Sequence, residues 1–268
     1  MVRIKLDITK SVEENASRYY EEAKKYKKKI EGAKRALEET KLKLEKIKKE
    51  HKKEKDKENK KIIIPSKREW YEKFRWFFSS EKFLVIGGRD ATTNELIIKK
   101  YTSPKDIVFH TDMAGSPFFV IKVEDKKPSQ KTLKEAADAT VTFSRAWKLG
   151  LSTTPVFYVK PEQITKKAKP GEYLQKGAFM IYGKTNYIEN MVNCAVGLFN
   201  NKIMAGPVEA IKANCKEYVV IEQGNEKTSL VAKYIQKRIG GNIDDIIRVL
   251  PSGGCKIKKP MRKKDEEI

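Results

Sequence analysis

The chain has 268 residues, with 58 Lys and Arg against 36 Asp and Glu, so its formal net charge is +22. A surplus of this size predicts a polyanionic partner, such as nucleic acid, a ribosome or an acidic membrane surface. Because 39% of the residues are hydrophobic and only three are cysteines, the composition excludes a collagen, a disulfide scaffold and a wholly disordered chain. The cysteines lie far apart without a C-x-x-C pair, which predicts buried thiols in a reducing compartment: Cys194, Cys215 and Cys255.

The beginning of the chain, MVRIKLDITK, alternates charged and apolar side chains and lacks the apolar core of a signal peptide. Apolar runs such as residues 62–64 are far shorter than the roughly 20 residues that a membrane-spanning helix needs. We therefore expect a cytoplasmic protein that does not enter a membrane.

Charge is concentrated in residues 1–69, which hold 24 basic and 14 acidic side chains. The run KKEHKKEKDKENKK at 48–61 has little apolar surface to bury, which is typical of a solvated helix end or a flexible linker. Pro65 stops any helix that reaches it. We expect a boundary between Lys61 and Trp70, followed by a segment of globular composition.

A heptad pattern precedes this boundary, because apolar or small residues recur at alternating steps of four and three. Ser11 and Glu14 form a capping box at its start. The pattern predicts a coiled-coil helix, and the alternative is a lone solvated helix. The chain contains no second helix of similar length and period, so the partner would be another copy, another protein or the globular part. The positions are Val12, Ala16, Tyr19, Ala23, Tyr26, Ile30, Ala33, Leu37, Thr40, Leu44 and Ile47.

The globular part mixes short β-rich runs with a few helices, which favours an α+β fold over a doubly wound sheet. We expect helices at 132–149, 228–239 and 244–249. Expected strands, bounded by glycine, proline and asparagine turns, are 83–86, 95–101, 106–110, 118–123, 156–159, 178–182, 193–198 and 217–222.

Catalytic chemistry is weakly indicated. His110 stands two residues before Asp112, a spacing that suits a general base or a metal ligand, or simply a hydrogen-bonded pair at a strand end. A metal site needs further ligands that the sequence does not place, and neither a P-loop nor a dinucleotide fingerprint is present. We therefore expect no cofactor, no metal and no enzymatic activity, and hydrolysis at His110 and Asp112 is the weakest alternative.

Aromatic and basic residues alternate at several places, a combination that contacts phosphates and stacks on unpaired bases when it is exposed. For residues 70–78 a buried core is the better interpretation, because so dense an aromatic cluster would not remain exposed. For residues 184–187 we expect a surface role. The polar turn with Asp90, Asn94 and Glu95 suits a ligand site and a strand connection equally well.

The stretch from Trp70 to Tyr187 resembles the NFACT-R domain, the RNA-binding module shared by NEMF, FbpA and Caliban. The resemblance lies in WYEKFRWFFSSEKFLVIGGRDATTNE, DIVFHTDMAGSPFFVIK, TLKEAADATVTFSRAWKLGL and PGEYLQKGAFMIYGKTNY, in that order. Upstream, IKLDITKSVEENASRYYEEAKKYKKKIEGAKRALEE is similar to the entry and helix of that family's coiled coil. Downstream, residues 188–262 are similar to an extension of archaeal members. The resemblance implies three parts: 1–61 coiled-coil helix and linker, 62–187 RNA-binding domain, and 188–268 α+β extension with a basic tail.

This resemblance implies a role in ribosome-associated quality control. Family members bind obstructed large ribosomal subunits, recruit tRNA and promote carboxy-terminal tailing of stalled chains. The implied partners are rRNA and tRNA. A separately encoded N-terminal half is implied as well, because family proteins normally begin with an NFACT domain that precedes the coiled coil. A standalone module and a homodimer are the alternatives, and a coiled-coil scaffold that binds proteins rather than RNA is the second function.

Residues that match the family's motifs are candidates for RNA contacts by their chemistry. Arginine and lysine suit phosphates, and asparagine suits a base or the RNA backbone. The motif HTDMAG departs from some relatives in carrying Ala114, so no role transfers to that position. The candidates are Arg89, Asp90, Asn94, Glu95, His110, Asp112, Arg145, Lys148, Lys184 and Asn186.

Overall fold

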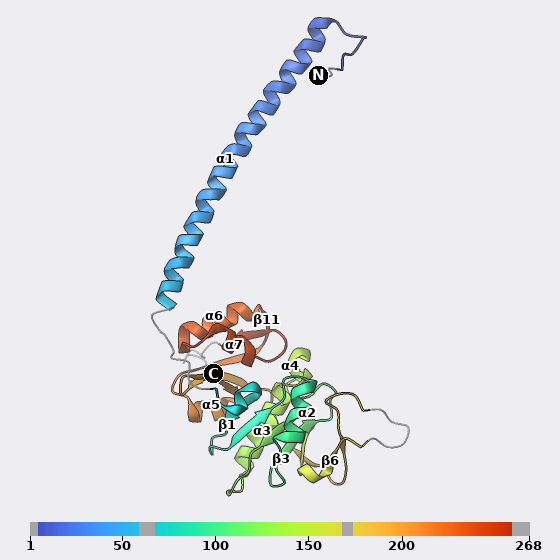
Figure 1. Ribbon diagram of the computed structural model, residues 1–268, viewed down its shortest axis with the longest axis vertical. Helices are drawn as coiled ribbons and strands as arrows, with labels where there is room; N and C mark the ends of the chain where they lie inside the picture. Colours follow the sequence, from blue (N-terminus) through green and yellow to red (C-terminus); the bar gives the residue numbers. More distant parts are fainter. Residues whose placement is uncertain (1–4, 59–67, 168–173, 259–268) are drawn as a thin grey trace, which may run out of the picture. The chain divides into compact units, whose positions relative to one another are not determined.

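The computed structural model describes residues 5–58, 68–167 and 174–258, without the side chains of 46–58. The chain divides into two compact units, Met1–Ile64 and Pro65–Ile268 (Figure 1). The second unit combines helices with antiparallel sheets, which confirms the expected α+β class. The predicted linker beyond residue 58 and the predicted basic tail at 259–268 lie outside the described residues.

The first unit consists of a long helix, α1 (Val12–Glu58), and a short entry segment. The capping box is present: the Ser11 N–H donates to Glu14 Oε2 at 2.9 Å, and the Glu14 N–H donates to Ser11 Oγ at 3.2 Å. Large apolar residues of the heptad pattern are exposed on α1, including Val12, Ile30 and Leu37. Whether this face forms a coiled coil stays a prediction.

The larger sheet of the second unit has six antiparallel strands. In spatial order they are β1 (Arg75–Phe78), β2 (Leu84–Gly87), β4 (Phe119–Ile121), β3 (Ile107–Thr111), β5 (Val156–Val159) and β8 (Asn186–Ile188). A turn of 3-10 helix, Trp70–Lys73, precedes β1, and a second, Pro161–Gln163, leads into a two-stranded ribbon of β6 (Ile164–Thr165) and β7 (Met180–Ile181). Helix α3 (Gln130–Thr142) packs across β3, β4 and β5.

A second sheet of four antiparallel strands follows in the sequence. Its order is β10 (Lys202–Gly206), β9 (Cys194–Phe199), β11 (Tyr218–Glu226) and β12 (Cys255–Ile257). Helix α5 (Val208–Asn214) packs on β9 and β10, and α6 (Thr228–Ile239) packs on β11 beside α7 (Ile243–Val249), as Figure 1 shows in orange and red.

The two sheets share one hydrophobic core, which is continuous across β1 and β10. The rings of Phe78 and Phe199 are 5.2 Å apart. Gly206 allows the close approach, because a Cβ there would lie 2.8 Å from Cγ of Phe77. In the dense aromatic segment before and within β1, Phe74, Trp76 and Phe77 are buried as expected of a core, whereas Trp70 at its start is exposed. The extension therefore packs against the preceding segment as part of one body.

Two expected elements were wrong, and both errors concern the site described below. Residues 95–101 are not a strand but part of α2 (Ala91–Lys100), because Asp90 caps a helix there and only Ile97 of its β-prone residues is fully buried. The helix expected at 132–149 breaks at Phe143. Ser144 begins a separate short helix, α4 (Arg145–Leu149), by accepting a hydrogen bond from the Ala146 N–H at 3.1 Å.

Candidate functional site

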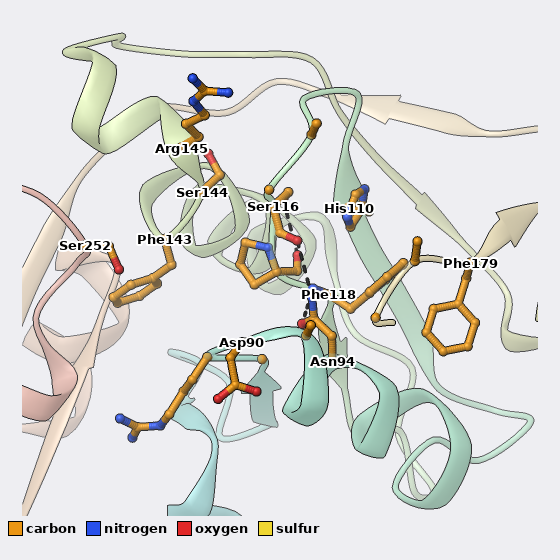
Figure 2. A pocket seen from close by; sticks show the side chains of 18 of the residues that line it. Asp90, Asn94, His110, Ser116, Phe118, Phe143, Ser144, Arg145, Phe179 and Ser252 are labelled. Atoms are coloured by element: carbon orange, nitrogen blue, oxygen red, sulfur yellow. Dashed lines mark hydrogen bonds between the residues drawn. The ribbon is translucent and has the colours of Figure 1, made fainter. Parts of the chain in front are cut away.

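A pocket of about 640 Å³ lies in the second unit (Figure 2). This volume falls within the roughly 300–1,000 Å³ that is usual for ligand sites. The pocket gathers residues from α2, the β3–β4 connection, α4, the segment 175–181 and the turn after α7. In Figure 2, Arg145 lies across from Asp90 and Asn94, with His110 and Phe179 on a third side. Six of the ten candidates line it: Arg89, Asp90, Asn94, His110, Arg145 and Lys148.

Asp90 is held in place as the N-cap of α2 rather than left free. Its carboxylate accepts hydrogen bonds from the Thr93 N–H at 2.8 Å and the Thr93 hydroxyl at 3.0 Å. The backbone hydrogen bond from Thr93 is the main reason that the pKa of Asp90 lies below its usual value. The one carboxylate that lines the pocket is therefore ionised and already engaged within the described part of the chain.

Asn94 fastens the β3–β4 connection to α2. Its Oδ1 accepts a hydrogen bond from the Phe118 N–H at 3.1 Å, and its Nδ2 donates to the Ser116 carbonyl at 3.5 Å. The Gly88 N–H donates to the Phe118 carbonyl at 3.0 Å. Both the N–H and the carbonyl of Phe118 are thus hydrogen-bonded, which gives the pocket a rigid wall.

That wall is aromatic. The His110 ring lies 4.3 Å from the Phe118 ring, and Phe179 meets Phe118 edge-on with centroids 5.6 Å apart. Phe118 is buried, whereas His110 and Phe179 are half-buried and face the pocket. Burial lowers the pKa of His110 below its usual value, against the opposing effects of backbone hydrogen bonds and Asp112. His110 is therefore neutral at neutral pH.

Two arginines approach the pocket from below the surface. Arg75 is buried, lies 4.4 Å from the Phe143 ring, and donates only weakly to the carbonyls of Val249 and Leu250, at 3.3 and 3.4 Å. Burial lowers its pKa to about 10. No described carboxylate forms an ion pair with it. A buried cation without an anion is unusual, because buried charges are normally paired.

Arg89 repeats this arrangement beside the first arginine. It donates to the Arg248 carbonyl at 2.7 Å and to the Phe74 carbonyl at 2.8 Å, while its Nε is buried without a hydrogen-bond partner among the described residues. Burial, followed by the nearby charges of Arg248 and Arg75, lowers the pKa of Arg89 to about 10. The two arginines stay charged at neutral pH and raise the local positive potential.

Three further cations stand at the rim. Arg145 and Lys148 are exposed on α4, and Lys176 is exposed on the segment opposite α2. None of the three has an ion-pair partner within the described ranges. Five cations thus line a pocket that holds a single capped carboxylate, an arrangement suited to a phosphate group.

Four candidates lie outside this lining. Glu95 sits on α2, where it accepts hydrogen bonds from Lys99 at 2.6 Å and from the Gly177 N–H at 3.2 Å; chiefly the Lys99 bond lowers its pKa to about 2. Asp112 accepts a hydrogen bond from the Tyr187 hydroxyl at 3.2 Å. Lys184 and Asn186 are exposed at or beside the edge strand β8, consistent with the expected surface position. The functional roles of all ten candidates remain predictions.

Several residues that line the pocket could not be identified as site residues from the sequence. Arg75 was hidden in an aromatic run, and nothing in the run says that one cation turns inward. Phe118, Phe179 and Lys176 belong to the matching family stretches but carry no motif of their own. Ser252 comes from the extension, and only the fold brings it to the pocket.

The described residues contain no group of three or more His, Cys, Asp and Glu side chains that could hold a metal ion. None of the helices in the described ranges has an apolar stretch long enough to cross a lipid bilayer. All three cysteines are buried and free, and burial raises the pKa of the Cys194 thiol to about 12.

Comparison with known proteins places most of the pocket lining, but not Ser252, within a recognised module. Residues 73–183 match the family model of the NFACT protein RNA binding domain. The division of the chain at residues 187 and 188 is not tested by this match and stays a prediction.

Similar proteins extend the match to most of the chain. The archaeal Rqc2 homolog aRqcH of Methanocaldococcus jannaschii is 50% identical over 268 residues, which is 96% of this chain and 40% of that protein. The ribosome quality control complex subunit NEMF of Homo sapiens is 44% identical over 120 residues, covering 44% of this chain and 11% of the human protein. The chain therefore spans well under half the length of these relatives.

Among solved structures, the C-terminal part of the fibronectin/fibrinogen-binding protein from Streptococcus suis has a TM-score of 0.37 and 19% sequence identity. The match covers 47% of each chain.

Proposed function

The chain belongs to the NFACT-R family of the Rqc2 and NEMF type, and on that premise we propose that it is an RNA-binding component of ribosome-associated quality control. The proposed ligands are rRNA and tRNA on obstructed large ribosomal subunits, in the cytoplasm. There the protein supports carboxy-terminal tailing of stalled nascent chains without performing catalysis itself.

The observation that carries this proposal is the excess of cations around one pocket, where none of them forms an ion pair with another described residue. Arg75 and Arg89 are partly or wholly buried without an ion-pair partner in the described part of the chain, and Arg145, Lys148 and Lys176 surround them. Burying a cation is unfavourable unless an anion compensates it, and a phosphodiester is the anion that RNA provides. The net charge of +22 adds long-range attraction for the same partner.

A second part of the proposal is that helix α1 pairs with a helix of another chain. The exposed heptad face of α1 supports pairing with another helix, because exposed Leu37 and Ile30 gain stability only when they are covered. We favour a helix of another protein of the quality-control system as the partner, with a homodimer as the alternative. Analytical ultracentrifugation of the purified chain tests this: a stable dimer would favour self-pairing over the heterologous partner.

The RNA proposal is tested by a salt titration of tRNA binding. The double variant Arg145→Gln and Lys148→Gln removes two exposed pocket cations that form no ion pair with another described residue. The control, Lys233→Gln and Lys237→Gln, removes two exposed lysines from α6, outside the pocket lining.

A plot of log binding constant against log salt concentration has a negative slope, and each lost phosphate contact reduces its magnitude by roughly 0.7 to 0.9. We expect the pocket variant to reduce this magnitude by about 1.5, and the control to reduce it by clearly less. Equal effects of the two variants would show that RNA binding is a property of total charge and not of this pocket.

A further inference from the structure

The pocket has two chemically different sides. Arg89, Arg145 and Lys148 supply cations, whereas His110, Phe118 and Phe179 supply ring faces and edges. A phosphate alone needs only the first side, because aromatic rings do not neutralise an anion. A nucleotide needs both, since it carries a phosphate and a flat base.

The aromatic side is built before any ligand arrives. Asn94 and Gly88 fix Phe118 through hydrogen bonds of 3.1 and 3.0 Å, and the buried Phe118 ring in turn supports His110 and Phe179. The segment with Phe179 is held to α2, because the Gly177 N–H donates to Glu95 at 3.2 Å. At Gly177 the backbone φ is +82°, and a Cβ would lie 2.7 Å from Cα of Ala91. A preorganised wall loses little conformational entropy when a ring stacks on it.

The depth of the site limits the form of RNA that can use it. A base inside a duplex is already stacked and paired, so it cannot enter a concave pocket unless it leaves the helix. A volume of about 640 Å³ accommodates one small ligand rather than a helical groove. The pocket therefore suits an unpaired residue of a loop, a bulge or a single-stranded end.

We propose that this pocket receives one unstacked nucleotide of RNA, with its base against His110 and Phe179 and its phosphate toward Arg89, Arg145 and Lys148. The inference rests on the proposed RNA-binding function and adds the form of the ligand. The extension takes part, because the carbonyl of Arg248 anchors Arg89 at 2.7 Å on the cationic side.

The test compares two single-stranded oligomers of equal charge, about 12 residues long, which lies within the span that common single-strand binding folds cover. One is oligouridylate and the other is the same ribose-phosphate chain without bases. Stacking of one base is expected to make the full chain bind roughly 5- to 150-fold more tightly to the wild-type protein. Equal affinity of the wild type for both oligomers would overturn the inference.

Two variants localise the effect. Phe179→Ala is expected to reduce the ratio of the two affinities toward one while leaving the affinity for the abasic chain unchanged. Phe179→Leu keeps most of the apolar volume and serves the same purpose if the alanine variant is poorly folded. The matched control is Tyr234→Ala, which removes an exposed aromatic side chain from α6 and is expected to keep the wild-type ratio. An unchanged ratio in a folded Phe179 variant would contradict the placement of the base.

The outcome also separates this inference from the function on which it rests. If the wild type binds both chains alike, but Arg145→Gln with Lys148→Gln weakens both, the pocket is a phosphate site and only the nucleotide inference fails. If that double variant changes neither affinity, the pocket is not the RNA site, and both proposals about it fail.

Discussion

A Cβ atom on Gly88 would lie 1.7 Å from Oδ1 of Asn94, the atom that accepts the hydrogen bond from the Phe118 N–H. The absence of a side chain at one position and the amide at the other are therefore parts of the same arrangement. Together they join the end of β2, the start of α2 and the connection that leads into β4.

The first prediction is a double-mutant cycle at this pair. Gly88→Ala is expected to destabilise the second unit by about 1–3 kcal/mol through overpacking, and Asn94→Ala by about 1–3 kcal/mol through the loss of its hydrogen bonds. The double variant is expected to lose less than the sum, because the added methyl then meets a vacant space. Chemical denaturation measures all four proteins, and strict additivity would show that the contact is not shared.

Asp90 gives a prediction in which stability and affinity move in opposite directions. Asp90→Ala removes the N-cap of α2 and is expected to lower the free energy of unfolding by about 0.5–2 kcal/mol. It also removes the carboxylate from a pocket lined by five cations, so RNA affinity at low salt is expected to rise. Ser129→Ala is the control, because it removes the cap of α3 outside the pocket lining. A rise in affinity with both variants would contradict the electrostatic explanation.

His110 predicts a pH dependence of stability. Its folded pKa lies below the unfolded value of 6.5, so the unfolded chain binds more protons at pH values between the two. Stability from the neutral imidazole is therefore present above that range and is lost as the pH falls through it.

The measurement is the free energy of unfolding of wild type and His110→Gln across this range. Carboxylates with raised pKa values, such as Glu135, contribute equally to both proteins and cancel in the difference. The wild type is expected to lose stability relative to the variant on acidification. Parallel curves would mean that His110 is not buried in its neutral form.

We expect Trp147 to contribute to the stability of the last strand, β12. Its indole N–H donates to the Gly254 carbonyl at 3.0 Å, immediately before β12, and its ring is buried. Trp147→Phe removes this donor and some packed volume, so we expect a loss of about 1–3 kcal/mol. Hydrogen exchange at residues 255–257 is expected to accelerate more than exchange in β3. Uniform acceleration across both strands would indicate a global effect instead.

Much of the fold follows from local patterns in the sequence. The capping box at Ser11, the strand at 156–159 and the helix at 228–239 lie where periodicity and capping chemistry placed them. The pattern wrongly predicts a strand at 95–101 because Leu96, Ile97 and Ile98 are consecutive and β-prone. The segment is helical because the hydrogen bonds between Asp90 and Thr93 cap the start of α2. Ser144 fits the helical pattern of 132–149, but its side chain caps the start of a separate helix.

The site was predictable in part. Family-like motifs identified Arg89, His110 and Arg145 as candidates, but sequence spacing does not say that they share one pocket. The inward course of Arg75 depends on carbonyls some 174 residues away in the chain, and no local pattern encodes such a distance. The aromatic wall also depends on tertiary structure, because Phe118 and Phe179 lie just before two different strands, β4 and β7, and meet only in the folded chain.

The anchors for Arg75 and Arg89 are main-chain carbonyls of residues 248–250. A carbonyl oxygen is present whatever side chain the residue carries, so the exposed Arg248 can be substituted while its anchor persists, whereas Leu250 is also needed in the core. A comparison of related sequences would then be expected to find an arginine at position 89 facing a variable residue at position 248. Shortening the end of α7, rather than substituting Arg248, is the change that would release Arg75, whereas Arg89 would keep its hydrogen bond to the Phe74 carbonyl.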